Sequence, residues 1–248
     1  MQIHIHPDQQ VLGETAGKEA AALIRTKIAS TDAATIVIGS DPSLAAVLHT
    51  LSKAPGINWG KVTIYQLGEW IGVSENHKAR HRKFLQDNLL NKLSGLKKAS
   101  LINGETILSD ELKRLNGSIQ ETSIDIAILG LRAQGQVGFN SEPADLKSTS
   151  PFLMVEPDTE TCKSLVAAGL YRTLNEVPRR AFTMSIHQLL RSKIIICAVS
   201  GSTHTDLVSR LASEDEDVSI PAMALKNHAG LHLHVDAEAA ATSPLRNS

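Results

Sequence analysis

Two hydrophobic patterns alternate along the chain. Short runs that are continuously apolar and rich in β-branched residues are typical of strands buried on both faces of a parallel sheet. Such runs cover residues 35–38, 124–129 and 194–199. Residues 62–67 are a further strand candidate, and 182–186 and 231–235 are weaker ones. Segments with apolar side chains on one helical face lie between them, at residues 11–28, 43–53, 79–93 and 206–211.

This alternation predicts an α/β fold, with a doubly wound, mostly parallel sheet flanked by helices. The chain has 248 residues, of which 42% are hydrophobic, enough to build a full core. No repeat of 20–50 residues and no low-complexity linker divides it. We therefore expect one domain over residues 1–248, with residues 237–248 as a frayed tail.

Charge and cysteine content narrow the possible partners. The formal net charge is −1, so no strong field attracts nucleic acid or an anionic membrane. Two isolated cysteines suggest a reducing compartment rather than a disulfide framework. The N-terminal residues lack the pattern of a secretory signal, and the aliphatic runs are too short to span a bilayer. We expect a cytoplasmic protein without nucleic-acid or membrane partners.

Polar or glycine-rich loops follow four of the expected strands, at residues 39–43, 67–72, 130–143 and 200–204. In open α/β sheets, ligands bind beyond the carboxyl ends of the strands. In the first loop, Gly39 and Ser40 suit an anion-binding turn, but Asp41 before Pro42 also fits a helix cap. In the fourth loop, Ser200, Gly201 and His204 allow the same two interpretations.

The second and third loops carry the candidate chemistry. Glu69 beside Trp70 fits either a desolvated acid with a raised pKa or a solvated turn residue. The third loop places Gln134 and Gln136 around Gly135. Amide side chains hold ligands by hydrogen bonds, but they do not titrate near neutral pH and cannot act as general acid or base.

Histidines and basic residues form two further groups. His4 and His6 alternate on a possible N-terminal strand, and His232 and His234 alternate on a late one. The four could meet if these strands were neighbours, but no acidic residue or cysteine accompanies them at metal-ligand spacing, so we expect exposed histidines and no metal. The basic stretch 77–83 fits a solvated helix start, or contact with an anionic ligand or a partner subunit.

Together, the four loops resemble those of the glucosamine-6-phosphate deaminase (isomerase) family, most closely its galactosamine-6-phosphate branch. The resemblance runs from about residue 23 to residue 235. Residues 38–42 stand where the family has Thr-Gly-Ser-Thr-Pro, and residues 66–72 match Asn-Met-Asp-Glu-Tyr-Val-Gly. Residues 130–143 match Gly-x-Gly-x-Asp-Gly-His-x-x-Phe-Asn-Glu-Pro with one extra residue, Ser141. The related 6-phosphogluconolactonases share the scaffold but lack this Phe-Asn-x-Glu-Pro ending.

The resemblance implies a Rossmann-like three-layer sandwich that converts an amino-sugar 6-phosphate into a ketose phosphate and ammonia. It implies no cofactor, and it implies a chain that can form homo-oligomers. In the family, an aspartate moves the C2 proton and a histidine helps to open the sugar ring. Those two positions align with Gly68 and Gln136, and the aspartate of the central loop aligns with Gln134.

Other family positions are kept or shifted. Glu69 and Glu142 remain as carboxylates, and His77 keeps the family spacing to a histidine. In the implied phosphate site a threonine becomes Asp41 and a lysine becomes His204. Arg172 is a possible displaced substitute for the family's phosphate-binding arginine.

The sequence therefore predicts a sugar or sugar-phosphate ligand, with a family reaction that is weak or absent. Three alternatives stay open. Glu69, Glu142 or His77 could substitute for the lost groups. The fold could act on a different sugar or as a 6-phosphogluconolactonase. The chain could also be a non-catalytic sugar binder, regulator or partner subunit.

Overall fold

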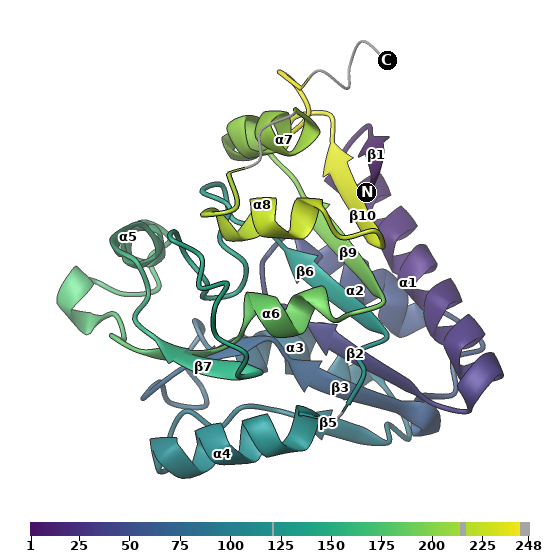
Figure 1. Cartoon of the computed structure of the whole chain (residues 1–248), viewed down its shortest axis with the longest axis horizontal. Helices are drawn as coiled ribbons and strands as arrows, with labels where there is room; N and C mark the ends of the chain where they lie inside the picture. Colours follow the sequence, from purple (N-terminus) through teal and green to yellow (C-terminus); the bar gives the residue numbers. More distant parts are fainter. Residues whose placement is uncertain (121, 214–216, 244–248) are drawn as a thin grey trace.

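The structure is a computed structural model that describes residues 1–120, 122–213 and 217–243. A seven-stranded parallel sheet forms its centre, in the order β1-β10-β9-β6-β2-β3-β5 (Figure 1). These strands are β1 (Gln2–His6), β2 (Ala34–Ile38), β3 (Val62–Gln66), β5 (Lys98–Ser100), β6 (Ile126–Gly130), β9 (Ile194–Val199) and β10 (Leu231–Asp236). The predicted doubly wound α/β fold is confirmed.

Helices cover both faces of this sheet. One face packs against α1 (Gln9–Thr31), α2 (Leu44–Lys53) and α3 (His81–Asn88). The other packs against α4 (Leu108–Ile119), α6 (Ile186–Leu190), α7 (Thr205–Ala212) and α8 (Pro221–Lys226). Successive side chains of a strand point to opposite faces of the sheet. Ile36 and Ile38 therefore pack in the core beneath α1, α2 and α3 (the first core), and Val37 packs in the core beneath α4, α6, α7 and α8 (the second core). The continuous apolar runs exist because both faces are covered.

A second, smaller sheet lies beside the carboxyl ends of the central strands. It is antiparallel, in the order β4 (Gly68–Trp70), β8 (Ala181–Met184) and β7 (Phe152–Val155), and α5 (Thr159–Ala167) follows it. The expected strand at 182–186 belongs to this sheet and not to the parallel one. It stops at Met184 because the Ser185 side chain accepts the Gln188 N–H and caps α6.

Other expected boundaries shift for local reasons. Residues 79–93 do not form one helix, since α3 ends at Asn88 and a 3₁₀ turn follows at Leu90–Lys92. The expected frayed tail includes Ala239 and Ala240, which are fully buried against the second core. Residues 244–248 of that expectation lie outside the described part of the chain. No helix among the described residues combines the length and apolar character needed to cross a membrane.

Candidate functional site

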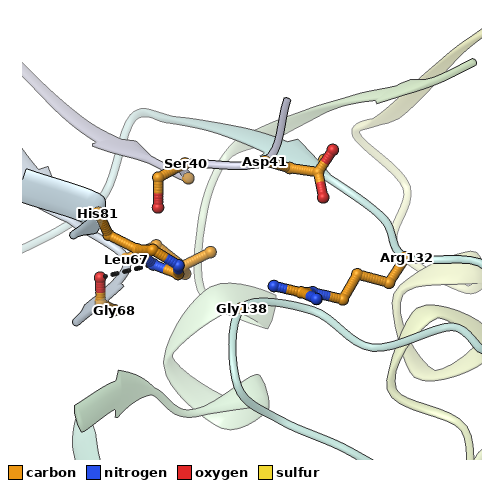
Figure 2. A pocket seen from close by; sticks show the side chains of 9 residues that line it. Ser40, Asp41, Leu67, Gly68, His81, Arg132 and Gly138 are labelled. Carbon is orange, nitrogen blue, oxygen red and sulfur yellow. Dashed lines mark hydrogen bonds between the residues drawn. The ribbon is translucent and has the colours of Figure 1, made fainter. Parts of the chain in front are cut away.

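A narrow pocket lies where β2, β3 and β6 end. It is lined by Gly39, Ser40, Asp41, Leu67, Gly68, His81, Gly130, Arg132 and Gly138 (Figure 2). Three of the four predicted loops therefore meet at one point of the sheet edge, as the topological rule for α/β sheets requires. About 20 Å³ is free between these side chains, close to the space needed for one water molecule.

Asp41 stabilises the turn that leads into α2, although the residue at the N-cap of that helix is Ser43. Asp41 Oδ1 accepts the backbone N–H of Ser43 at 3.0 Å and the Ser43 hydroxyl at 2.8 Å, which fixes the turn into α2. The same side chain lines the pocket. A Cβ on Gly130 would lie 2.3 Å from Asp41 Cβ, so only glycine at position 130 lets β6 pass beside this turn. The loop thus places a negative charge beside the amides that would receive an anion.

The sequence resemblance aligns Gly68 with the family's proton-moving aspartate, and in the structure its surroundings leave no room for a side chain. A Cβ there would lie 2.9 Å from both the Phe139 ring and the carbonyl oxygen of Phe182. Phe139 packs edge-on against Trp70, which is buried, so the ring cannot easily retreat. The packing of the small sheet therefore closes the space that a base would use.

His81, at the start of α3, supplies the imidazole in the pocket. Its ring stacks on Phe139 with 4.8 Å between centroids, and its Nδ1 donates to the carbonyl oxygen of Gly68 at 3.2 Å. Desolvation, followed by the nearby charge of Arg132, lowers the pKa of His81 to about 3. The ring is therefore neutral at physiological pH, with its lone pair on Nε2. Sequence reasoning placed His81 only in a basic stretch and missed it as a site residue.

Arg132 was also missed, although it is the cation of the pocket. It follows β6 in the third loop and is half-buried. Its guanidinium extends across the pocket toward the side where His81 and Gly68 lie (Figure 2). A planar guanidinium is well suited to bind phosphate or carboxylate oxygens through two N–H groups. The signal available in the sequence was an arginine where the family motif has a glycine.

Glu69 does not face the pocket. Its carboxylate is fully buried and accepts the backbone N–H groups of Trp70, His81 and Arg82, together with the Gln66 side-chain amide. Burial raises the pKa of the Glu69 carboxyl, and these four donors oppose the shift. Of the two forms expected from sequence, the structure matches the desolvated acid with a raised pKa, but the carboxylate caps the first turn of α3 instead of facing the pocket.

The remaining residues of the third loop also point elsewhere. Gln136 is buried and its Nε2 donates to Asp158 Oδ2 at 3.0 Å, at the N-terminus of α5. Gln134 and Glu142 line a separate surface hollow beside α7. Gly135 adopts φ 80° and packs so tightly on Ile220 that a Cβ would lie 2.3 Å from Ile220 Cγ2.

In the fourth loop, a carboxylate of the protein occupies the backbone N–H that an anion would bind. Both carboxylate oxygens of Asp236, at the end of β10, accept the backbone N–H of Gly201 at 3.0 and 3.1 Å. Ser200 and His204 flank this contact and do not line the pocket. An anion at Gly201 would have to displace Asp236.

Two predicted residues, His77 and Arg172, are not part of the pocket lining. His77 stacks on Tyr171 with 4.8 Å between ring centroids, and its Nδ1 accepts the Ala79 N–H. Arg172 is exposed next to Tyr171, and its side chain does not line the pocket. The structure thus assembles Gly39, Ser40, Asp41 and Gly68, and leaves the other predicted residues outside.

Comparison with known proteins identifies the family of this chain. The family model described as glucosamine-6-phosphate isomerases/6-phosphogluconolactonase matches residues 7–233. The chain belongs to this family. A glucosamine-6-phosphate deaminase of Shouchella clausii is 28% identical over 233 residues, covering 92% of this chain and 93% of that protein. One of Clostridium perfringens is 31% identical over 189 residues, covering 74% and 76%.

Solved structures of family members share the fold. A monomeric glucosamine-6-phosphate deaminase superposes with a TM-score of 0.85 at 21% identity, covering 97% of this chain and 99% of that one. A 6-phosphogluconolactonase from Shewanella baltica gives 0.77 at 15% identity, covering 95% and 97%. The pocket therefore sits on the scaffold of the glucosamine-6-phosphate isomerase/6-phosphogluconolactonase family.

Proposed function

We propose that the pocket at the ends of β2, β3 and β6 binds an anionic sugar, of the sugar-phosphate class that the family acts on. We further propose that the chain carries out the deaminase–isomerase reaction weakly or not at all. Both proposals rest on which side chains line the pocket. Its ionisable lining residues are Asp41, His81 and Arg132, while Glu69 and Glu142 point elsewhere.

Isomerisation needs a group that takes a proton from C2 and returns it near neutral pH. General acid–base groups contribute about 10²–10⁴-fold each, and they work best with a pKa near the operating pH. His81, with its pKa lowered to about 3, is too weak a base for that task. Asp41 is held by two hydrogen bonds from Ser43 at the turn into α2.

The pocket contains side chains that can bind an anionic sugar. The Arg132 guanidinium can bind a phosphate or carboxylate through two N–H groups, and the Ser40 hydroxyl can form a hydrogen bond to a sugar hydroxyl. The space among the side chains is too small for a sugar, so Arg132 must swing outward as the ligand enters. It is half-buried and belongs to a loop, which allows this movement.

Ammonia release from glucosamine 6-phosphate and galactosamine 6-phosphate tests the catalytic half of the proposal. Binding of the same compounds and of fructose 6-phosphate, measured by calorimetry, tests the other half. We expect saturable binding with turnover far below one per second. Turnover near one per second would refute the loss of activity. Hydrolysis of 6-phosphogluconolactone, assayed in parallel, would replace the proposal by a lactonase function.

A further inference from the structure

The four histidines of the first and last strands meet at the edge of the central sheet. β1 pairs in parallel with β10, so that His4 lies opposite His234 and Gln2 opposite His232. His232 and His234 contact Glu19 of α1, so they lie on the face of the sheet that α1 covers. His4 and His6 stack on His234 and share this face. The prediction of exposed histidines is wrong for His6, which is 8% exposed, and for His234, which is fully buried.

A carboxylate from α1 completes this cluster. Glu19 Oε2 accepts the Nε2–H of His234 at 2.8 Å, and Glu19 Oε1 accepts the Nδ1–H of His232. Because a carboxylate only accepts, the proton of the neutral His234 sits on Nε2. Its Nδ1 then accepts from His6 Nε2 at 3.0 Å. The sequence concealed Glu19 because more than 200 residues separate it from its partners on β10.

His4 is the unsatisfied member of the cluster. Its ring stacks on that of His234 with 4.8 Å between centroids. Its Nε2 is buried and has no hydrogen-bond partner among the residues that the structure describes. A buried nitrogen without a partner costs about 1–3 kcal/mol, and its position beside a second imidazole and a carboxylate is that of a metal ligand.

We propose that His4, His234 and Glu19 bind a divalent transition-metal ion such as Zn²⁺, at a site separate from the sugar pocket. One donor atom from each lies within 4.8 Å of the other two. Bonds of about 2.0–2.2 Å to a tetrahedral ion place donor atoms about 3.5 Å apart, so modest side-chain rotations suffice. Two imidazoles and one carboxylate are a common donor set for zinc and leave one position for water.

The surroundings favour this occupant. The hydrogen bond from His234 Nε2 to Glu19 Oε2 already aims this imidazole nitrogen at the carboxylate. An ion would replace the proton on His234 Nε2. His6 would then pass its Nε2 proton to His234 Nδ1 and take up the displaced proton on its own Nδ1, so both imidazoles stay neutral and His234 Nδ1–H donates to His6 Nε2. His232 would hold the second oxygen of Glu19. The Glu19 and His232 side chains are 25% and 15% exposed, which leaves a route from solvent.

A bound ion would link three elements through one site: β1 and β10, which already pair along their backbones, and α1, which packs on them. β1 is the edge strand of the sheet, and its outer side pairs with no other strand among those described. Coordination by His4 would tie it to β10 and α1. Any ligand that binds only the folded state stabilises it, so the melting temperature should rise with metal concentration.

Untagged protein, stripped with a chelator, should be titrated with Zn²⁺ by calorimetry and melted with and without the ion. We expect one ion per chain and a higher melting temperature. His4→Gln and Glu19→Gln should each weaken binding by at least about tenfold. The matched control is His49→Gln, at an exposed position on α2, which should bind as the wild type does.

X-ray absorption spectroscopy on the Zn²⁺-loaded wild type tests the same site without relying on variants that could fail to fold. Two imidazoles and one carboxylate around the ion would support the proposal. An ion without imidazole ligands, the absence of stoichiometric binding, or unchanged affinity in folded His4→Gln and Glu19→Gln proteins would overturn it.

Discussion

Glu69 Oε1 accepts the backbone N–H of His81 at 3.1 Å, which ties the carboxylate to the helix that carries the pocket imidazole. Glu69 Oε2 accepts the next N–H, of Arg82, at 2.7 Å. The first N–H groups of a helix have no partner within the helix, and the helix N-terminus favours negative charge. Glu69 therefore fixes the backbone position of His81, although Glu69 itself does not line the pocket.

Glu69→Gln should destabilise the protein by about 1–3 kcal/mol. The amide retains one acceptor oxygen, while its NH₂ group faces donors that the carboxylate satisfied. Chemical denaturation of wild type and variant measures the difference. Glu75→Gln, at an exposed position in the following loop, is the matched control and should change little. A fully stable Glu69→Gln protein would contradict the capping role.

Gly68→Asp should not create deaminase activity, although the sequence resemblance aligns position 68 with an aspartate of the family. The new Cβ would clash with Phe139 and with the Phe182 carbonyl, so the small sheet must shift. We expect lower stability and no gain in ammonia release. Gly117→Asp is the control, since a Cβ at Gly117 meets nothing within 4 Å. A folded, active Gly68→Asp protein would show that the space is not closed.

Arg132→Ala should weaken binding of sugar phosphates by about 10- to 100-fold, because hydrogen bonds to charged groups contribute about 1.5–3 kcal/mol. Calorimetry with fructose 6-phosphate and with unphosphorylated fructose separates the anion contribution, which Arg132→Ala should remove. Arg172→Ala changes the same residue type outside the pocket and should leave affinity unaltered. Equal effects of the two variants would place the anion elsewhere.

Acidification should destabilise the protein through His81. Its pKa is lowered to about 3, from an ordinary value of 6.5 in the unfolded chain. Below pH 6.5 the unfolded chain takes up a proton that the folded chain refuses. The free energy of unfolding therefore falls as pH drops from 6.5 toward 3, by up to about 1.4 kcal/mol per pH unit.

His81→Phe preserves a ring against Phe139 and removes this titration. As pH falls from 6.5 to 4, the free energy of unfolding of the wild type should decrease relative to that of His81→Phe. Denaturation curves at several pH values measure it, with His49→Phe at an exposed position as the control. His234, with its pKa lowered to about 4, acts in the same direction in both proteins and cancels in the comparison. Parallel curves for wild type and His81→Phe would exclude a role for His81.

Much of the fold was readable from local pattern. The run at 194–199 coincides with β9, because a strand buried on both faces must be apolar at every position. The turn after β2 could also be predicted, since aspartate, proline and serine at the start of a helix form hydrogen bonds with residues nearby in the sequence. The small sheet could not be predicted in the same way, because its strands β4, β8 and β7 are short and pair with strands that are distant in the sequence.

The sequence by itself determined the strand–helix order, and with it the edge of the sheet where ligand loops gather. Only the tertiary structure decided which side chains reach that edge. It turned Glu69 away to cap α3 and brought in His81 and Arg132. It also placed Glu19 of α1 against histidines of β10. Hydrophobic periodicity acts between near neighbours, whereas a side chain's partner, burial and charge state depend on residues that only folding brings together.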